Sequence, residues 1–344
     1  MRYIFSTLMT GAILLMLAAG CRQQPGDDRL FFSGQTMGTT WSVVLRSATA
    51  VDVAKLKQQL QDQLDHINAL MSTYDPASEI SRFNRQTTDD WFELSNETFH
   101  VIELSQKISG LTGGAFDISI GALVDLWGFG ATETDRTTPA AKLLGDVQSQ
   151  VGYEHLHLHA DRSAISKKIP GLRIDLSAIA KGYAVDVLAG QLDRLQIEDY
   201  LVEIGGEMKI AGSRSNDIPW RIAVEKPLAG SRGVESVLSV TDIALATSGN
   251  YRNFYEVDGQ RYGHTMDPGS GRPVQHNLAS VTVFDPSCAR ADALATAVMV
   301  MGAEQGKRFC QKHNIAAYFL IHEEDGLVSY ASSAFQGLVQ RMNP

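Results

Sequence analysis

Residues 280–301 read SVTVFDPSCARADALATAVMVM, and this stretch contains a strand and a helix in succession. Residues 280–284 favour an extended strand, and residues 289–301 favour a helix. Asp292 and Thr296 are four residues apart within that helix, so their side-chain oxygens face the same way, as binding of a hard cation requires. The stretch therefore predicts a strand followed by a helix that carries part of a metal site.

Helices and strands alternate in the same way along the rest of the chain. We expect strands at residues 39–46, 200–204, 208–211, 220–224 and 316–321. We expect helices at residues 53–71, at 76–84 with Asp75 as N-cap, after Ser95, and from Ser177 to about residue 195. A polar, helix-like surface excursion is expected at residues 131–150.

Asp258-Gly259 lies between two short β-prone segments and indicates a hairpin with a tight turn. Antiparallel hairpins interspersed with helices favour an α+β fold over a doubly wound parallel sheet. We therefore predict mixed or antiparallel sheets with packed helices.

The N-terminus indicates export and membrane attachment. Residues 1–20 contain one charge, Arg2, followed by a short apolar run and small residues, which is typical of a secretory signal. Cys21 follows directly and resembles the lipidated cysteine of a bacterial lipoprotein, although Ala18 stands where a leucine is usual. Residues 21–33 are expected to form a tether and residues 34–344 a catalytic domain on the periplasmic side of an inner or outer membrane.

The charge of the chain limits its partners. Its 30 basic and 39 acidic residues give a formal net charge of −9. An acidic surface argues against nucleic acid as a ligand, so a polyanionic ligand must be bound by local groups. The sequence leaves open whether Cys288 and Cys310 form a disulfide.

Phosphate-binding features surround the predicted metal site. Thr247-Ser248-Gly249 combines small hydroxyl side chains with a glycine, so backbone N–H groups can approach an anion closely. His264 titrates near neutral pH and precedes a turn at Asp267-Pro268. Together with Asp292 and Thr296, these residues predict metal-assisted phosphoryl chemistry.

Other positions have two interpretations. Asp117, after Gly113-Gly114, either accepts a hydrogen bond from a ligand or caps a helix, and Tyr74 either packs or stacks on a ring. Lys181, one turn into the helix after Asp175, either contacts phosphate or faces solvent.

Three further patterns bear on metals and nucleotides. His155, His157 and His159 share one strand face, and we interpret them as solvated rather than as zinc ligands. Gly205-Gly206 indicates a tight backbone passage. The sequence contains neither a Rossmann nor a P-loop motif.

A series of short motifs occurs in order between about residue 33 and the C-terminus: Met37-Gly38-Thr39, Ser72-Thr73-Tyr74, Gly114-Ala115-Phe116-Asp117, Leu126-Trp127-Gly128-Phe129-Gly130, Asp175-Leu176-Ser177, Gly205-Gly206, Thr247-Ser248-Gly249-Asn250-Tyr251, His264-Thr265-Met266-Asp267-Pro268 and Ala291-Asp292-Ala293. In this order they resemble the ApbE family of periplasmic flavin transferases. The resemblance implies a two-lobed, T-fold-like α+β architecture.

The resemblance also implies an activity. Such enzymes are FAD:protein FMN transferases, which attach FMN through a phosphoester to a threonine or serine of a target protein and release AMP. Their targets are subunits of sodium-pumping and related membrane redox complexes, with an acceptor segment of the form D-x-x-[ST]-G-A-[ST]. On this basis Mg²⁺ is the cofactor and FAD the substrate.

The matching positions receive roles from the resemblance. The expected Mg²⁺ ligands are Ala178, Asp292 and Thr296. The expected FAD contacts are Met37, Tyr74, Ala115, Phe116, Asp117, Lys181 and His264, to which the phosphate-binding pattern adds Asp175, Thr247 and Ser248. At Lys181 the chain differs from relatives that have an acidic residue there.

Charge considerations suggest the catalytic groups. His264 is the expected base for the acceptor hydroxyl, and Asp267 is either a second candidate base or the group that orients His264. Two alternatives stay open: a pyrophosphatase that gives FMN and AMP, and a flavin-binding lipoprotein without activity.

Overall fold

The computed structural model describes residues 29–46, 51–132, 136–215, 218–225, 233–250 and 253–342. Its strands are β1 (Arg29–Thr36), β2 (Thr39–Arg46), β3 (Phe92–Glu93), β4 (Leu156–His159), β5 (Ala164–Lys167), β6 (Asp199–Ile204), β7 (Glu207–Ala211), β8 (Trp220–Glu225), β9 (Val234–Val240), β10 (Ile243–Gly249), β11 (Phe254–Val257), β12 (Gln260–Gly263), β13 (Met266–Asp267), β14 (Arg272–Pro273), β15 (Leu278–Asp285), β16 (Ala316–Glu323) and β17 (Gly326–Ala331). The helices are α1 (Val53–Met71), α2 (Glu79–Arg85), α3 (Asn96–Thr112), α4 (Gly121–Leu126), α5 (Ala141–Gln148), α6 (Ala180–Arg194), α7 (Cys288–Lys312) and α8 (Ser333–Met342).

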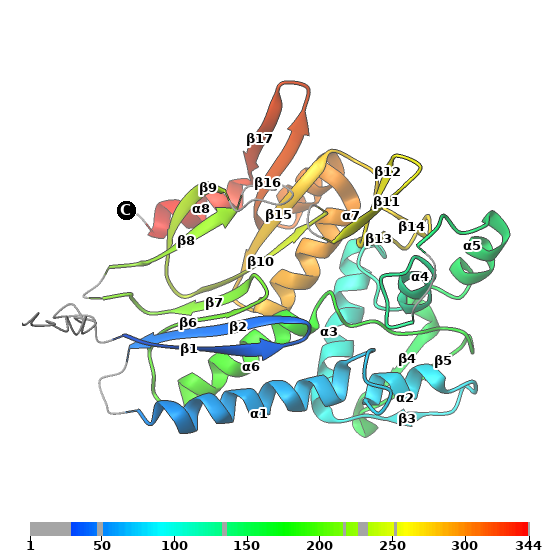
Figure 1. Cartoon of the computed structure of the whole chain (residues 1–344), viewed down its shortest axis with the longest axis horizontal. Coiled ribbons are helices and arrows are strands. Elements are labelled where there is room, and N and C mark those ends of the chain that lie inside the picture. Colours follow the sequence, from blue (N-terminus) through cyan, green and yellow to red (C-terminus); the bar gives the residue numbers. More distant parts are fainter. Residues whose placement is uncertain are drawn as a thin grey trace, which may run out of the picture.

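An eight-stranded sheet forms the centre of the molecule (Figure 1). Its strand order is β1-β2-β6-β7-β10-β15-β16-β17, and every neighbouring pair is antiparallel. The predicted α+β fold with antiparallel sheets and packed helices is thereby confirmed. Among the described residues, no helix is both long enough and apolar enough to span a bilayer.

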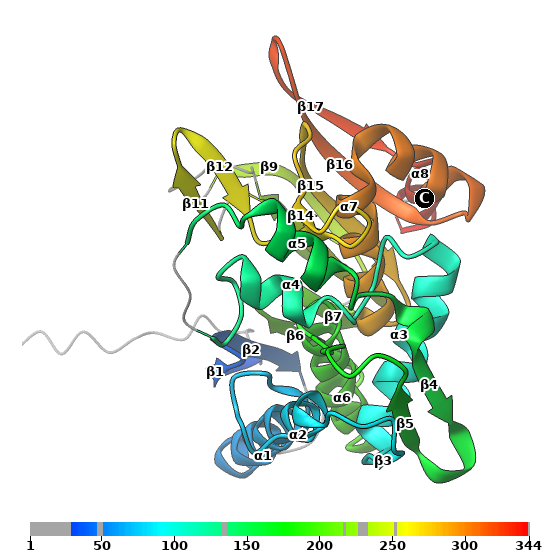
Figure 2. The same ribbon diagram turned by 90° about the vertical axis from the view of Figure 1, so that its right-hand side faces the viewer.

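Both faces of the sheet are covered. Helices α6 and α7 pack against β6, β7, β10 and β15, while α1 packs along β1. Helix α8 and the β8–β9 hairpin lie on the other face around a smaller apolar cluster that includes Trp220, Phe284 and Phe335. The small sheet β3-β5-β4 and the helices α2 to α5 lie beside the large sheet (Figures 1 and 2). This arrangement agrees with the two-lobed expectation, and one continuous apolar core joins the two parts.

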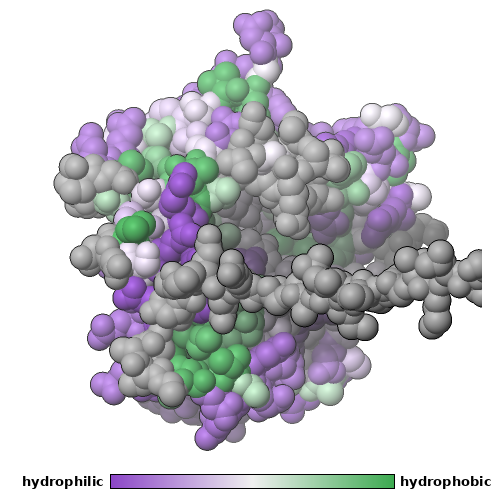
Figure 3. Space-filling model, turned by 60° about the vertical axis from the view of Figure 1, so that its left-hand side comes forward, coloured by the Kyte–Doolittle hydropathy of each residue, from purple (hydrophilic) through white to green (hydrophobic). Residues whose placement is uncertain are grey.

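The surface agrees with the polar composition of the chain. On the face shown in Figure 3, hydrophilic side chains surround separate apolar patches. Phe31, on the edge strand β1, is the most exposed large aromatic side chain of the sheet, with 66% of its surface accessible. Cys288 and Cys310 are both buried and free, so the two cysteines that the sequence left unassigned do not form a disulfide.

Most predicted elements occur where the sequence placed them. The strands at residues 39–46 and 200–204, the helix at 53–71 and the hairpin at Asp258-Gly259 are confirmed. Asp258 and Gly259 both have positive φ, which the tight hairpin turn requires.

The predicted first residues of two helices were wrong, and the reason is the same for both helices. Helix α2 begins at Glu79, because Ser78 accepts the hydrogen bond of the Ser81 N–H, whereas Asp75 accepts that of Ala77 within a preceding turn. Helix α6 begins at Ala180, since Asp175 accepts the Ser177 N–H and holds the chain in another turn. Local side-chain turns competed with the helix in each case.

The described residues begin inside the segment predicted as a tether. Strand β1 begins at Arg29, so residues 29–33 of the predicted tether belong to the sheet. The proposed signal peptide, Cys21 and the rest of the tether lie outside the described residues, as does Tyr251.

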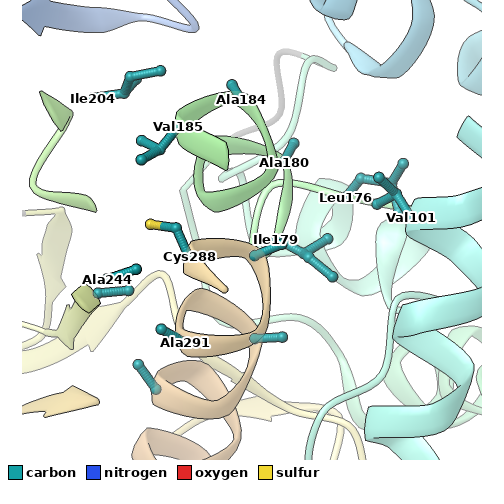
Figure 4. Packing of buried hydrophobic residues seen from close by; sticks show 14 of the residues in the cluster. Val101, Leu176, Ile179, Ala180, Ala184, Val185, Ile204, Ala244, Cys288 and Ala291 are labelled. Carbon is teal, nitrogen blue, oxygen red and sulfur yellow. The ribbon is translucent and has the colours of Figure 1, made fainter. Parts of the chain in front are cut away.

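Helices α6 and α7 meet at a point where only glycine fits. A Cβ at Gly182 would overlap the carbonyl group of Cys288 and lie 2.8 Å from the Cα of Ala289. Figure 4 shows small side chains on both sides of this contact, among them Ala180 of α6 and Ala291 of α7. The Gly182 N–H donates a hydrogen bond of 3.0 Å to the carboxylate of Asp292. Close packing thus links the start of α6 to the predicted metal residue on α7.

We expect Gly182→Ala to lower the free energy of unfolding by about 1–3 kcal/mol, because the added methyl group has to separate two packed helices. Gly190→Ala is the matched control in the same helix. A Cβ there meets only the flexible end of Arg194, at 3.7 Å, so its effect is expected to be neutral or stabilising. Denaturant unfolding of both variants tests this, and equal stabilities would contradict the close contact.

Candidate active site

A cavity of about 930 Å³ opens between the helices α1, α6 and α7 and the ends of several strands. This volume suits a ligand the size of a dinucleotide. The cavity brings together ten of the predicted site residues: Met37, Tyr74, Asp175, Ala178, Lys181, Thr247, Ser248, His264, Asp292 and Thr296. They come from the β1–β2 turn, the end of α1, the segment before α6, strand β10, the segment after β12, and α7.

The N-terminal half of α7 supplies Asp292 and Thr296, as the helical spacing predicted. Asp292 is 3% exposed and is held by the Gly182 N–H. The Thr296 hydroxyl lies 3.3 Å from that of Ser248 on β10. The helix and the strand thus place carboxylate and hydroxyl oxygens in one region of the cavity.

Lys181 contributes a positive charge to this region of the cavity. Its ammonium lies 3.3 Å from Glu207 Oε1 and 3.9 Å from Asp292 Oδ2. Burial lowers the pKa of Lys181, but Asp292 and Glu207 more than offset it, so the net effect raises the pKa well above the usual range. Lys181 is therefore charged at neutral pH.

The two carboxyl groups experience opposing influences. Burial raises the pKa of Glu207 and Asp292, and the Lys181 charge lowers both. The raised pKa of Glu207 by itself favours a protonated, neutral carboxyl group at neutral pH, whereas the raised pKa of Lys181 favours a charged ammonium. An ammonium 3.3 Å from a carboxylate oxygen stabilises the charged form of both partners, so we treat the three groups as one charged cluster.

His264 follows β12 and faces the cavity. Its Nδ1 lies 3.2 Å from the backbone carbonyl of Asn253. A carbonyl only accepts, so Nδ1 carries the proton and Nε2 is left as the acceptor in the neutral ring. Desolvation lowers the pKa of His264, the hydrogen bond with Asn253 partly opposes this, and the Lys181 charge lowers the pKa again, so the net shift is downward. The neutral imidazole is thus favoured, as a proton acceptor requires.

Asp267 is not among the residues that line the cavity, unlike the ten predicted residues named above. Its carboxylate accepts the N–H groups of Gly269 and Ser270 at 2.9 and 3.2 Å and closes the turn there. The group that orients the His264 ring is the Asn253 carbonyl. The role predicted for Asp267 stays a prediction without support from these contacts.

Aromatic groups form one side of the cavity entrance. Tyr74 is 67% exposed and donates a hydrogen bond to the Phe129 carbonyl at 3.1 Å. The Phe129 ring packs beside Tyr255 of the β11–β12 hairpin and lies 6.5 Å from the His264 ring, centre to centre. A flat ring system has aromatic partners here.

Ala115, Phe116 and Asp117 are not among the residues that line the cavity. The Asp117 carboxylate accepts the N–H groups of Ser119 and Tyr153, and the Phe116 ring is buried in the core. Burial raises the pKa of Asp117. Their predicted contact with FAD stays a prediction.

The donor set formed by the segment before α6 and the N-terminal half of α7 fits a hard divalent cation. Ala178, Asp292 and Thr296 line the same cavity and can supply a backbone carbonyl, a carboxylate and a hydroxyl oxygen. Within the described ranges, no cluster of three or more His, Cys, Asp or Glu side chains could hold a metal. Oxygen ligands of mixed type suit Mg²⁺, which retains several of its waters.

Sequence reasoning did not assign a role to Glu207 or Asn253. Glu207 follows the Gly205-Gly206 pair, which the sequence marked as a tight passage, and both glycines have positive φ. That turn directs Glu207 toward Lys181. Asn253 acts through its backbone carbonyl, so its residue type gives no signal.

The same fold occurs in known proteins. A model of the ApbE family matches residues 37–319. The chain is 41% identical over 328 residues to the FAD:protein FMN transferase of Vibrio cholerae serotype O1, which covers 95% of this chain and 97% of the relative. It is 36% identical over 346 residues to the FAD:protein FMN transferase of Haemophilus influenzae, covering 99% of each. The solved structure of the flavin transferase ApbE from Vibrio cholerae superposes with a TM-score of 0.84 at 41% identity, covering 90% of this chain and 98% of that one.

We expect Asp292→Asn to weaken Mg²⁺ binding at least about tenfold, because a neutral amide is a poorer ligand for a hard cation. Asparagine keeps an acceptor for the Gly182 N–H, so the helix contact is retained. Glu304→Gln, at an exposed position of the same helix, is the matched control and should bind Mg²⁺ as the wild type does. Isothermal titration calorimetry measures all three, and unchanged affinity in Asp292→Asn would exclude this residue as a ligand.

Proposed function

The chain belongs to the ApbE family, and we propose that it transfers the FMN part of FAD to a threonine or serine hydroxyl of a target protein. The observation that carries this proposal is the single cavity in which His264 faces the same space as Asp292 and Thr296. A proton acceptor and a hard-oxygen metal site in one cavity are what phosphoryl transfer from a pyrophosphate needs.

The reaction balances as a displacement at phosphorus. The acceptor oxygen forms a bond to the FMN-side phosphorus, and the P–O bond to the AMP side breaks. The hydroxyl proton passes to Nε2 of His264, the ring nitrogen that the Asn253 carbonyl leaves unprotonated. AMP leaves with the electron pair of the broken bond. The enzyme thus needs a neutral His264 at the start of each turnover.

Charge in the cavity determines how FAD is placed. The positive charge of Lys181 in the cavity favours the pyrophosphate. Mg²⁺ bound by Asp292, Thr296 and the Ala178 carbonyl would neutralise charge on the pyrophosphate and on the leaving AMP. Tyr74 and Phe129 at the entrance supply aromatic partners for the flavin ring.

The proposed acceptors and the proposed location of the enzyme rest on the amino-acid sequence. We propose that the acceptors have a segment of the form D-x-x-[ST]-G-A-[ST] and belong to membrane redox complexes. Lipidation of Cys21 would keep the enzyme on the periplasmic side of the membrane, close to such targets.

One assay tests the activity against its alternatives. The soluble chain is incubated with FAD, Mg²⁺ and a fragment that contains the acceptor segment, and AMP and protein-bound flavin fluorescence are followed. AMP released in equal amount with labelled fragment supports the transferase. AMP without label would instead identify a pyrophosphatase, and neither product would identify a flavin-binding protein.

We expect His264→Ala to bind FAD but to transfer FMN about 10²–10⁴-fold more slowly, which is the usual effect of losing a general base. His322, exposed near the end of β16, provides the control, and His322→Ala should transfer at the wild-type rate. Initial rates of flavin attachment measure the effect. Wild-type transfer by His264→Ala would remove this residue from the mechanism.

The pH dependence has a defined sign. Because the pKa of His264 is lowered from 6.5, the base stays neutral at neutral pH. Transfer should therefore fall only as the pH drops through a value below 6.5. A pH–rate profile at saturating FAD and Mg²⁺ measures this. A profile whose acidic limb lies above that value would contradict a depressed histidine as the base.

A further inference from the structure

Glu207 is a buried carboxylate in the cavity for which the reaction described above has no role. It is the first residue of β7 and follows a turn of two glycines with positive φ. Its side chain is 4% exposed, and its Oε1 lies 3.3 Å from the Lys181 ammonium. Among the described residues, its Oε2 has no hydrogen-bond partner. A buried carboxylate is costly unless an opposite charge compensates it.

Lys181 has two carboxylates within reach, at unequal distances. The contact with Glu207 is 3.3 Å, and the contact with Asp292 is 3.9 Å. The same Asp292 oxygen also accepts the Gly182 N–H at 3.0 Å. Glu207 is therefore the closer partner of the lysine.

A metal ion on Asp292 creates a conflict with Lys181. Both are cations, both are attracted to the same carboxylate, and they repel each other across a poorly solvated space. If Lys181 had only Asp292 as a partner, it would compete with the metal for that ligand. A second carboxylate resolves the competition, because the ammonium keeps an anion when the metal takes Asp292.

We propose that Glu207 is a positioning residue that holds Lys181 away from Asp292, so that Asp292 can bind Mg²⁺ while Lys181 faces the pyrophosphate. This inference rests on the proposed function for the identity of the metal and the ligand. The turn geometry supports it: the aliphatic part of Lys181 lies beside Gly205, where a Cβ would stand 3.5 Å from the lysine Cδ. The glycine turn thus brings Glu207 and the lysine together.

Glu203, in the β6–β7 hairpin, is a second carboxylate whose contacts are structural. Its Oε1 accepts the Gly206 N–H at 2.8 Å, and its Oε2 accepts the Ser42 hydroxyl at 3.2 Å. Glu203 therefore stabilises the turn and its neighbouring strand. Glu207 instead faces a cation inside the cavity, which assigns it to the ligand site rather than to the turn.

The test measures Mg²⁺ affinity without FAD, by competition with Mn²⁺ followed by electron paramagnetic resonance. We expect Glu207→Gln to weaken Mg²⁺ binding about tenfold, because Lys181 then pairs with Asp292 alone. Lys181→Met should bind Mg²⁺ at least about threefold more tightly than the wild type, because the competing cation is gone. In the Lys181→Met background, Glu207→Gln should change the affinity by less than about threefold.

The Mg²⁺ affinity of the double variant distinguishes a positioning role of Glu207 from a purely electrostatic effect of its charge. An equal effect of Glu207→Gln in both backgrounds would show that Glu207 acts by its charge alone, and this would overturn the proposal. Wild-type affinity in Glu207→Gln would overturn it as well. In turnover, the Glu207→Gln defect should appear as a raised KM for Mg²⁺, with kcat recovered at saturating metal.

Two controls keep the outcomes distinct. Glu203→Gln removes a carboxylate from the same hairpin and should leave Mg²⁺ affinity unchanged. Failure of the wild type to bind Mg²⁺ or Mn²⁺ would refute the metal site of the proposed function, which is a different result from normal binding by Glu207→Gln. If Glu207→Gln does not fold by circular dichroism, Lys181→Met decides, and binding no tighter than wild type overturns the proposal.

Discussion

The contact between Gly182 and Asp292 is the constraint on which the rest of the site depends. The absence of a side chain at Gly182 lets α6 approach α7 closely, and the Gly182 N–H fixes the carboxylate of Asp292. One consequence is that Lys181, the preceding residue, enters the same cavity. Helix packing and the placement of Asp292 and Lys181 in the cavity are therefore set by one pair of residues from two helices.

The site contains a positive charge, Lys181, although the protein as a whole has an excess of acidic residues. The chain has a formal net charge of −9, whereas the pyrophosphate of FAD is itself an anion. This lysine lies between two buried carboxyl groups, which would attract the divalent cation of the proposed function. In the proposed function, a bound divalent cation would offset the negative charge of the pyrophosphate.

Sequence reasoning found those parts of the site that depend on local spacing. Asp292 and Thr296 could be related because one helix fixes their separation, and the Asp258-Gly259 hairpin because its turn demands positive φ. The pairing of Glu207 with Lys181 depends on how β7 lies against α6, which no local pattern encodes. The orientation of His264 comes from a backbone carbonyl, which every residue type possesses.

The central claim is that one cavity holds the metal, the pyrophosphate and the base in contact. A crystal structure of the chain with FAD and Mn²⁺, with the metal located by anomalous scattering, tests it most directly. We expect a metal peak bonded to the Asp292 carboxylate, the Thr296 hydroxyl and the pyrophosphate, with Nε2 of His264 facing the FMN-side phosphorus. A metal bound away from Asp292, or FAD bound outside this cavity, would contradict it.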